Sequence, residues 1–551
     1  MADYGFALFR ASGTDGCQNN KIQNCNITLN STNFWTASPL NLESGATGIL
    51  LHNRIRTSIN SPLTITSGTG RNDNNQFLGN TILNVINGFV ISGYNDGISP
   101  YNYYDQNNII GAAGLGNTIE KYGNIGSNIR SSGIYTIYQN NIDISYNVFI
   151  NYGSGGGAHT GKLYGIFISS PISGSYGQII SVTNNTISLL KNSSEIMVGI
   201  KIGNSGVDAT SISILSNIIE DCSFISGTDE FYGIDQSFSA SNLIISNNLI
   251  QNNNLNTNST SASYLIYNTN RSSTVTVSNN NLINNSLTGS PIGTLYGYYN
   301  NSTTAVGIST IQDNLIDGLS VPTTSASSVI GIRLSSAIAQ LKKVNGNTIT
   351  NLVGGTSTSA WTAGIYINYM AVGSEITMNT VSNVSSPTNV VGINCASLTS
   401  STTSFNQSFV ISNNNVEEIN STSNSAKISG IGIYTLTAVE CNSNSINNIV
   451  AYGTSPLELR GLGIGGGASG NIININNCNI SNVKHSNVGG SANPVGLYLF
   501  PNSPTLNIFN NNINEISGDA LDFVVGIYGT CLLYTSPSPR DRTRSRMPSS
   551  A

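Results

Sequence analysis

The stretch that decides the fold is Leu243-Ile244-Ile245-Ser246-Asn247-Asn248-Leu249-Ile250. Its apolar run stops at an asparagine and then resumes, which is typical of two short strands joined by a tight turn. The phrase recurs along the chain, and most neighbouring asparagine anchors lie 30 to 35 positions apart. A fixed period of this size predicts a stacked array, in which each unit buries its apolar side against its neighbours.

We expect the anchoring asparagines to form a structural ladder. Asparagine tolerates the left-handed backbone angles of a turn, and its amide can hydrogen-bond to the same amide about 4.8 Å away in the next coil. The predicted ladder consists of Asn185, Asn217, Asn248, Asn281, Asn314, Asn347, Asn379, Asn414, Asn444 and Asn511. Cys478 stands where a further asparagine is due, so we expect a weak point there.

Each unit also carries a glycine followed by alternating residues, as in Val198-Gly199-Ile200-Lys201-Ile202. Only 9% of the residues are charged, and the polar ones are mainly strand and turn formers. These patterns predict an all-β right-handed parallel β-helix solenoid of about 15 coils with a period of about 33 residues. The leucine-rich repeat is the rival fold, but it has shorter units of about 20–29 residues and often a helix.

We expect residues 1–529 to form a single continuous β-helix, with irregular coils over 1–150 and regular repeats over 151–529. The last residues, 531–551, interrupt the repeat, carry four arginines and resemble a translated sequencing adapter. We therefore expect 530–551 to be a non-native, disordered tail, and the chain to be a fragment of a larger protein. The alternative is a basic tail that binds nucleic acid.

The repeat resembles those of large secreted bacterial surface proteins with a right-handed parallel β-helix, many of which end in a type IX secretion sorting domain. Gly346-Asn347-Thr348-Ile349 and Asn184-Asn185-Thr186-Ile187-Ser188 carry this resemblance. It covers nearly all of residues 17 to 529 and implies a secreted or cell-surface location. The chain opens without a basic and then apolar signal segment, which we expect upstream.

The architecture is also similar to the pectate-lyase-like superfamily of polysaccharide lyases and hydrolases. Such enzymes need paired carboxylates or basic residues gathered on one exposed sheet. The carboxylate pairs here, Glu220-Asp221, Asp229-Glu230 and Glu417-Glu418, are sequence neighbours, so a strand would point their members to opposite faces. The three histidines, His52, His159 and His485, are isolated from other metal ligands in the sequence. We therefore predict no catalytic residue, cofactor or metal site.

Six cysteines precede the tail: Cys17, Cys25, Cys222, Cys395, Cys441 and Cys478. They lie far apart, in or beside strand phrases, which favours buried single thiols. The even number leaves disulfides open as the alternative.

An aromatic row is the one surface signal of the sequence. Two positions past the strand glycine, alternation predicts outward side chains, and the aromatic ones are Phe167, Tyr267, Tyr299, Tyr366, Tyr434, Tyr498 and Tyr528. Exposed aromatic rings at regular spacing can stack on sugar rings; the alternative is ordinary packing, since tyrosine favours strands anyway. The tyrosines just before the glycine position should instead point inward and stack in the core: Tyr164, Tyr232, Tyr264 and Tyr296.

These features predict a secreted or cell-surface scaffold with a structural or adhesive role, which binds polysaccharide or a cell-surface glycan and is monomeric. The alternative function is a polysaccharide lyase or glycoside hydrolase. Without the four arginines and Asp541 of the tail, 17 basic residues stand against 25 acidic ones, and this net charge of −8 disfavours nucleic acid as a partner. The sequence contains no run of about 20 apolar residues, so we expect no membrane insertion.

Overall fold

The computed structural model describes twenty segments of the chain. They are 3–31, 45–57, 62–97, 102–123, 130–152, 159–169, 178–192, 195–203, 208–227, 229–269, 272–302, 307–335, 340–357, 361–397, 408–435, 438–466, 471–487, 490–501, 505–519 and 522–529. The predicted tail over 530–551 lies outside these residues.

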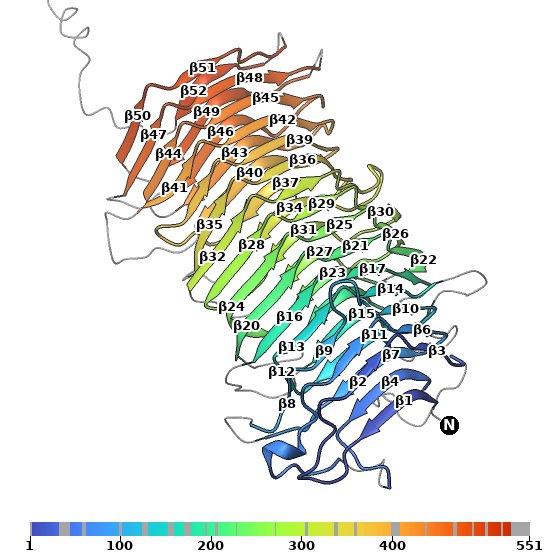
Figure 1. The fold of residues 1–551 in the computed structure, drawn as a ribbon. Helices are drawn as coiled ribbons and strands as arrows, with labels where there is room; N and C mark the ends of the chain where they lie inside the picture. Colours follow the sequence, from blue (N-terminus) through green and yellow to red (C-terminus); the bar gives the residue numbers. More distant parts are fainter. Residues whose placement is uncertain are drawn as a thin grey trace, which may run out of the picture.

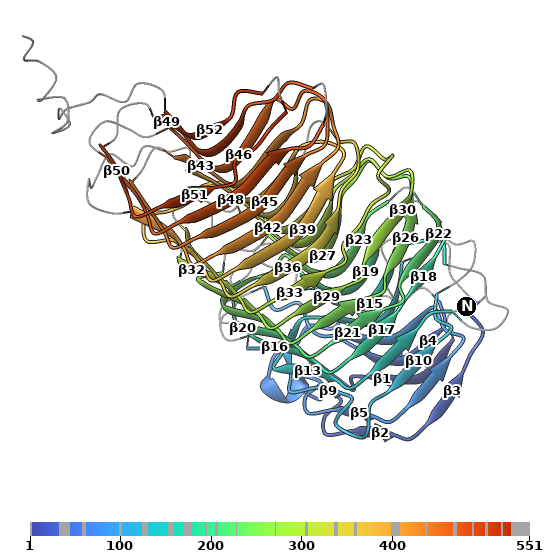
Figure 2. The same cartoon turned by 90° about the horizontal axis from the view of Figure 1, so that it is seen from above.

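The described residues form a parallel β-solenoid, which confirms the predicted fold class and period. Three long parallel sheets run along it, one of 16 strands and two of 15, and each coil adds one strand to each sheet. Figures 1 and 2 show the coils stacked in chain order along one axis, from the blue N-terminal end to the red C-terminal end. The single helical turn among the described residues is η1 (Gly68–Gly70), which disfavours a leucine-rich repeat with helices.

Sheet I contains 16 strands: β1 (Tyr4–Phe9), β4 (Thr47–His52), β7 (Asn87–Ser92), β11 (Ser131–Ile137), β15 (Leu163–Ser169), β19 (Met197–Ile202), β23 (Phe231–Gln236), β27 (Ser263–Asn268), β31 (Leu295–Asn300), β34 (Val329–Leu334), β37 (Thr362–Ile367), β40 (Val390–Ser397), β43 (Lys427–Thr435), β46 (Glu458–Gly466), β49 (Pro494–Pro501) and β52 (Val525–Gly529).

Sheet II contains 15 strands: β2 (Lys21–Gln23), β5 (Gln76–Leu78), β9 (Ile109–Ile110), β13 (Ile142–Ser145), β16 (Ile179–Thr183), β20 (Asp208–Leu215), β24 (Ser239–Ser246), β28 (Thr274–Ser278), β32 (Gly307–Gln312), β35 (Gln340–Asn345), β38 (Glu375–Thr377), β41 (Ser408–Ser412), β44 (Ala438–Asn442), β47 (Ile472–Asn476) and β50 (Thr505–Phe509).

Sheet III contains 15 strands: β3 (Asn26–Thr28), β6 (Thr81–Leu83), β10 (Thr118–Glu120), β14 (Val148–Ile150), β17 (Thr186–Ser188), β21 (Ile218–Glu220), β25 (Leu249–Gln251), β29 (Asn281–Ile283), β33 (Leu315–Asp317), β36 (Thr348–Val353), β39 (Thr380–Ser386), β42 (Asn415–Ser421), β45 (Ser445–Ala451), β48 (Asn479–His485) and β51 (Asn512–Asn514). Two smaller parallel sheets contain β18 (Leu190–Lys191), β22 (Ser223–Gly227), β26 (Asn254–Thr257) and β30 (Ser286–Gly289), and then β8 (Asp105–Gln106) and β12 (Gln139–Asn140).

Alternation within the strands builds one apolar core along the axis. In β28, for example, Val275 and Val277 are buried in this core, while Thr274 faces solvent. The same positions in other coils carry isoleucine, valine, leucine or phenylalanine. Burying one such side chain stabilises the fold by about 1.5–3 kcal/mol, so the repeated apolar positions supply the main driving force.

The corner between sheets II and III contains the predicted asparagine ladder. Asn347 donates from its backbone N–H and from Nδ2 to Oδ1 of Asn379, over 3.0 and 2.9 Å, and Nδ2 also donates to the carbonyl of Ile311 at 2.9 Å. Equivalent amide contacts of 2.8–3.0 Å run from Asn80 to Asn444. The buried amides are thus satisfied by the neighbouring coils, as burial requires.

Two details of the ladder differ from the sequence prediction. The left-handed residue is usually the one before the ladder asparagine, such as Asn184 (φ 56°) or Asn247 (φ 58°), so the ladder residue itself does not take the left-handed conformation. In the Asn279-Asn280-Asn281 run, Asn280 is the ladder member and Asn281 is exposed at the start of β29. The prediction of Asn281 was wrong because three asparagines in a row hide the register.

Cys478 interrupts the ladder, as predicted from its position. Its backbone N–H still donates to Oδ1 of Asn511 at 2.9 Å. Toward the preceding coil it offers sulfur instead of an amide, and Asn444 Nδ2 lies 3.9 Å from Cys478 Sγ. Sulfur is a weak acceptor, so this step of the ladder has weaker hydrogen bonds than its neighbours.

The structure contains further side-chain ladders that the sequence reasoning missed. Five residues past the main ladder, Asn253 Nδ2 donates to Asn285 Oδ1 at 2.7 Å, and the N–H of Cys222 donates to Asn253 Oδ1. In the first coils a third ladder joins Asn20, Asn75, Asn108 and Gln139. The spacing of five residues, Asn248 to Asn253 and Asn280 to Asn285, was the available signal.

Candidate ligand-binding groove

The glycine in each strand of sheet I determines which side chains point to the outer face of that sheet. A Cβ on Gly165 would lie 2.6 Å from the carbonyl oxygen of Gly199 and 2.8 Å from Cγ2 of Ile187, so this inward position has no room for a side chain. The next residue, Ile166, also points into the core. As a result Tyr164 and Phe167 share the outer face, and their rings stack with centroids 4.8 Å apart.

The tyrosines before the glycine position stack along the axis, but not in the core. The centroids of Tyr232 and Tyr264 lie 5.1 Å apart, and those of Tyr264 and Tyr296 lie 5.2 Å apart with ring planes at 6°. They lie outside the inner core, on the outer face with Tyr267 and Tyr299. The prediction that they point inward was wrong, because the glycine position breaks the alternation of the strand.

The predicted aromatic row is only partly one row. Tyr267 pairs with Tyr299, Tyr366 follows Arg333, and Tyr498 pairs with Tyr528. Phe167 lies in this row but is buried, with 2% of its surface exposed, so it cannot contact a ligand. Tyr434 lies two residues further along its strand, in a neighbouring row, and pairs with Gly465. The sequence assigned it wrongly because its strand has two glycines, Gly430 and Gly432, and Gly432 holds the row position.

The self-stacking of the tyrosines limits what this row can bind. Rings of Tyr264, Tyr296 and Tyr299 lie nearly parallel, with centroid separations of 4.8 to 5.7 Å and plane angles of 6° to 18°. Arg333 covers the ring of Tyr366 at 4.0 Å. Rings that cover one another offer edges and hydroxyls rather than faces to solvent. The middle of the row is therefore no open stacking platform.

An open groove of about 270 Å³ lies on the same sheet, over β40, β43, β46 and β49. Its floor includes glycines in adjacent coils, Gly432, Gly463 and Gly465, at positions where other coils carry side chains. A Cβ on Gly465 would lie 3.0 Å from Cδ2 of Tyr434, so the missing side chain leaves room for that ring over Gly465. The register of three glycines thus hollows the outer face.

The groove combines aromatic rings with charged groups. Tyr434 and Phe500 are 53% and 49% exposed, so both present ring surface to solvent. Glu458 accepts ion-pair contacts from Arg460 at 3.1 Å and from Lys427 at 2.9 Å. Arg460 also lies 3.6 Å from the ring centroid of Tyr498. Because the charged groups hold one another in place, the groove is formed before any ligand arrives.

Trp361 and Asn394 also line the groove. Trp361 packs against a small apolar cluster of Ile330, Ala363 and Val391 on the outer face. The amide of Asn394 can donate and accept, so the groove offers neutral and charged hydrogen-bonding groups beside its rings. This combination fits a ligand with one apolar face and a polar rim.

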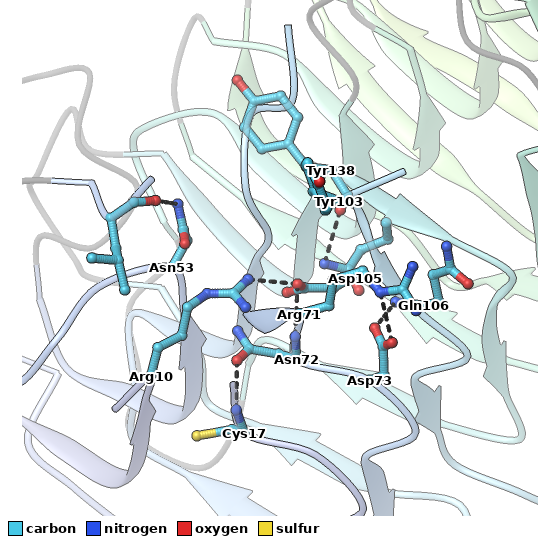
Figure 3. Close-up of polar contacts among 12 residues, drawn as sticks. Arg10, Cys17, Asn53, Arg71, Asn72, Asp73, Tyr103, Asp105, Gln106 and Tyr138 are labelled. Carbon is cyan, nitrogen blue, oxygen red and sulfur yellow. Dashed lines mark hydrogen bonds and ion pairs between the residues drawn. The ribbon is translucent and has the colours of Figure 1, made fainter. Parts of the chain in front are cut away.

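A buried polar cluster in the first coils is a second candidate site (Figure 3). Arg10 and Asp105 form an ion pair of 2.5 Å with both side chains fully buried. Oδ1 of Asp105 also accepts the N–H of Asn72, and Oδ1 of Asn72 accepts the N–H of Cys17, both over 2.9 Å. These are the backbone-to-Oδ1 contacts of the asparagine ladders, so the cluster links successive coils.

Burial dominates the electrostatics of this cluster. It raises the pKa of Asp105 from 3.8 to about 6, against the opposing attraction of Arg10. Among the described residues, Nε and Nη1 of Arg10 and Oδ2 of Asp105 are buried without a hydrogen-bond partner. A group with no access from solvent cannot take a ligand such as a sugar, so we assign the cluster to the stability of the first coils.

Three of the carboxylates and histidines considered in the sequence have partners within the protein. Glu220 accepts a hydrogen bond from Gln251, and Asp229 accepts the N–H of Glu230. His485 contacts Asp522 at 2.7 Å through Nδ1 and the carbonyl of Gly453 at 2.8 Å through Nε2, so neither ring nitrogen is left for a nucleophile. Within the segments that the structure describes, no three His, Cys, Asp or Glu side chains are grouped to hold a metal ion.

No family model matches the chain, and comparisons with curated proteins and with solved structures give no match either. Among the described residues, no helix is long and apolar enough to cross a membrane. The geometry of the groove therefore carries the functional argument.

Proposed function

We propose that the chain is a secreted or cell-surface scaffold that binds a glycan in the groove on sheet I. The observation that carries this proposal is the pairing of two half-exposed rings, Tyr434 and Phe500, with Glu458 and Arg460 over a glycine floor. The scaffold role rests on the stacked coils and on the resemblance to bacterial surface β-helix repeats.

A sugar ring suits this groove for a physical reason. It has an apolar C–H face, which packs on an aromatic ring, and a rim of hydroxyls, which bind carboxylate, guanidinium and amide groups. Small-molecule pockets usually measure about 300–1,000 Å³. The groove, at about 270 Å³, is slightly smaller than this range and is open, so it fits one or two sugar rings within a longer chain.

Trp361 allows a direct binding test. The chain has two tryptophans, and Trp361 lines the groove while Trp35 lies outside the described residues. Titration with fragments of pectin, alginate and glycosaminoglycans should change the fluorescence of Trp361 for the glycan that binds. Trp361→Phe should remove that change while leaving binding detectable by calorimetry.

Three alanine variants distinguish the groove from the tyrosine row. Tyr434→Ala and Phe500→Ala should each weaken binding about tenfold or more, since a contacting ring contributes more than about 1.4 kcal/mol. Tyr299→Ala is the matched control, a tyrosine on the same sheet outside the groove, and should leave the affinity unchanged. Loss of binding in Tyr299→Ala alone would move the site to the tyrosine row.

The same incubations test the alternative enzymatic function. Release of unsaturated or reducing ends from any of these polysaccharides would replace the scaffold proposal by a lyase or hydrolase. Binding without such products supports the scaffold.

A further inference from the structure

Two cysteines of successive coils meet in the apolar core. Cys441 lies in β44, and Cys478 follows β47 at the interrupted ladder position. Both belong to the inner core and are fully buried. Both are free thiols in the structure.

One amide holds the two sulfurs. Asn444 Nδ2 lies 3.4 Å from Cys441 Sγ and 3.9 Å from Cys478 Sγ. Cys478 Sγ also lies 3.6 Å from the carbonyl oxygen of Cys441. Within the described part of the chain, Cys222 offers a contrast, because its sulfur contacts the carbonyl of Glu220 two residues away and no contact with another cysteine is seen.

We infer that Cys441 and Cys478 are a disulfide-forming pair, a modification site where oxidation joins two successive coils of the solenoid. The bond would close a loop spanning 37 positions at the one step where the ladder from Asn80 to Asn511 lacks its amide. Closing a loop of this length restricts the unfolded chain and so stabilises the folded one.

The electrostatics of the pair favour exchange through Cys478. A hydrogen bond with Cys441 lowers the pKa of Cys478 below its usual range, and the same contact, together with burial, raises the pKa of Cys441 well above its usual range. The thiolate is the attacking species in thiol–disulfide exchange. Cys478 is therefore the first nucleophile of the pair.

The oxidant is a small-molecule disulfide. The Cys478 thiolate attacks one sulfur of this external disulfide. The S–S bond of the external disulfide breaks, and one external thiol leaves with a proton. Cys441 then loses its proton and attacks Cys478 Sγ, which forms the protein disulfide and expels the second external thiol. Two protein thiols are oxidised and one external disulfide is reduced. Because both sulfurs are buried, the exchange needs a local opening that admits the oxidant while Cys441 and Cys478 stay in contact.

Oxidative refolding tests the inference. The full chain is refolded with oxidised and reduced glutathione or with reductant alone, then denatured, alkylated and mapped by peptide mass spectrometry. We expect the peptides of Cys441 and Cys478 to be recovered cross-linked after oxidation and alkylated separately after reduction. Cys222 should be alkylated in both samples. Complete alkylation of Cys441 and Cys478 in oxidised, folded chain, or a cross-link to another cysteine, would overturn the inference.

Cys478→Asn is the matched variant, because it removes the thiol and restores the ladder amide. Circular dichroism should show it folded, with no cross-link under either condition. Oxidation should raise the thermal unfolding midpoint of the unmodified sequence and leave that of Cys478→Asn unchanged. An equal rise in both proteins would also contradict the inference, since the stabilisation would then arise elsewhere.

Discussion

Asn280 and Asn281 show how strongly position decides the role of one residue type. Asn280 accepts the N–H and Nδ2 of Asn248 at Oδ1, and its own Nδ2 donates to Oδ1 of Asn314 and to the carbonyl of Ile245. Asn281, the next residue, is exposed at the start of β29. A buried amide in such a chain of contacts is costly to remove, because its partners lose their hydrogen bonds too.

Alanine should therefore destabilise the fold strongly at position 280 and very little at position 281. Asn280→Ala removes the acceptor of the Asn248 backbone N–H and the Nδ2 donor of the Ile245 carbonyl in the core, and we expect the unfolding free energy to fall by about 3 kcal/mol or more. Asn281→Ala should change it by less than about 0.5 kcal/mol. Chemical denaturation of the two variants side by side measures this. Equal costs would mean that the amide contacts do not stabilise the coil.

The buried Asp105 predicts an unusual pH dependence at the residue scale. Burial raises its pKa in the folded state from 3.8 to about 6, so the folded chain binds this proton more tightly than the unfolded chain does. The resulting stability is fully present below about pH 4 and is lost as the pH rises through about 6. From pH 4 to 7, the unmodified sequence should lose up to about 3 kcal/mol relative to Asp105→Asn.

Denaturation curves of both proteins across this range measure the difference. Asp15→Asn, which changes an exposed carboxylate of the first coil, is the control and should follow the unmodified sequence. If the unmodified sequence instead gains stability over Asp105→Asn as the pH rises, the attraction of Arg10 outweighs the burial of Asp105.

At the scale of the strand, the sheet I glycine is the element that sets the outer face. A Cβ on Gly331 would lie 2.6 Å from the carbonyl oxygen of Gly364 and 2.8 Å from Cγ2 of Ile349. Gly526 has the same place in its strand but has nothing within 4 Å of its Cβ position. We expect Gly331→Ala to cost about 1–3 kcal/mol by overpacking, and Gly526→Ala to be neutral within about 0.5 kcal/mol.

Thermal unfolding of the two glycine variants measures this contrast. An equally mild effect at Gly331 would show that β34 shifts away from its neighbour without loss. In that case the two rows of outward side chains on sheet I would not depend on close approach of the backbones.

The elements differ in how far the sequence alone could predict them. The period and the ladder were readable because Asn347 and its equivalents recur in each unit beside apolar alternation. The outer face could not be predicted, because the inward orientation of the Gly165 position depends on close approach to a carbonyl of the next coil. The groove was hidden for the same reason. Gly432, Gly463 and Gly465 become one floor only when the register of β43 and β46 is known.

At the scale of the whole molecule, the strand pairing of the solenoid joins neighbouring coils only. Each inner strand of sheets I, II and III pairs with the strands of the preceding and following coils, so no sheet joins distant coils directly. In such an array, stability is close to a sum of coil and interface contributions. The groove depends on the coils of β40, β43, β46 and β49 and on Trp361 just before β37, so damage several coils away should leave its shape intact.

Hydrogen exchange of the full chain tests this locality. In the unmodified sequence, amides of the middle strands, such as β28 and β33, should exchange more slowly than those of β1 and β52, because end coils have a neighbour on one side only. Asn280→Ala should speed exchange in β25, β29 and β33, the strands next to the lost amide, and leave β45 and β48 unchanged. Mass spectrometry of peptides from both proteins resolves these regions. Faster exchange along all coils in Asn280→Ala would instead show one cooperative unit, in which the groove and a distant ladder step unfold together.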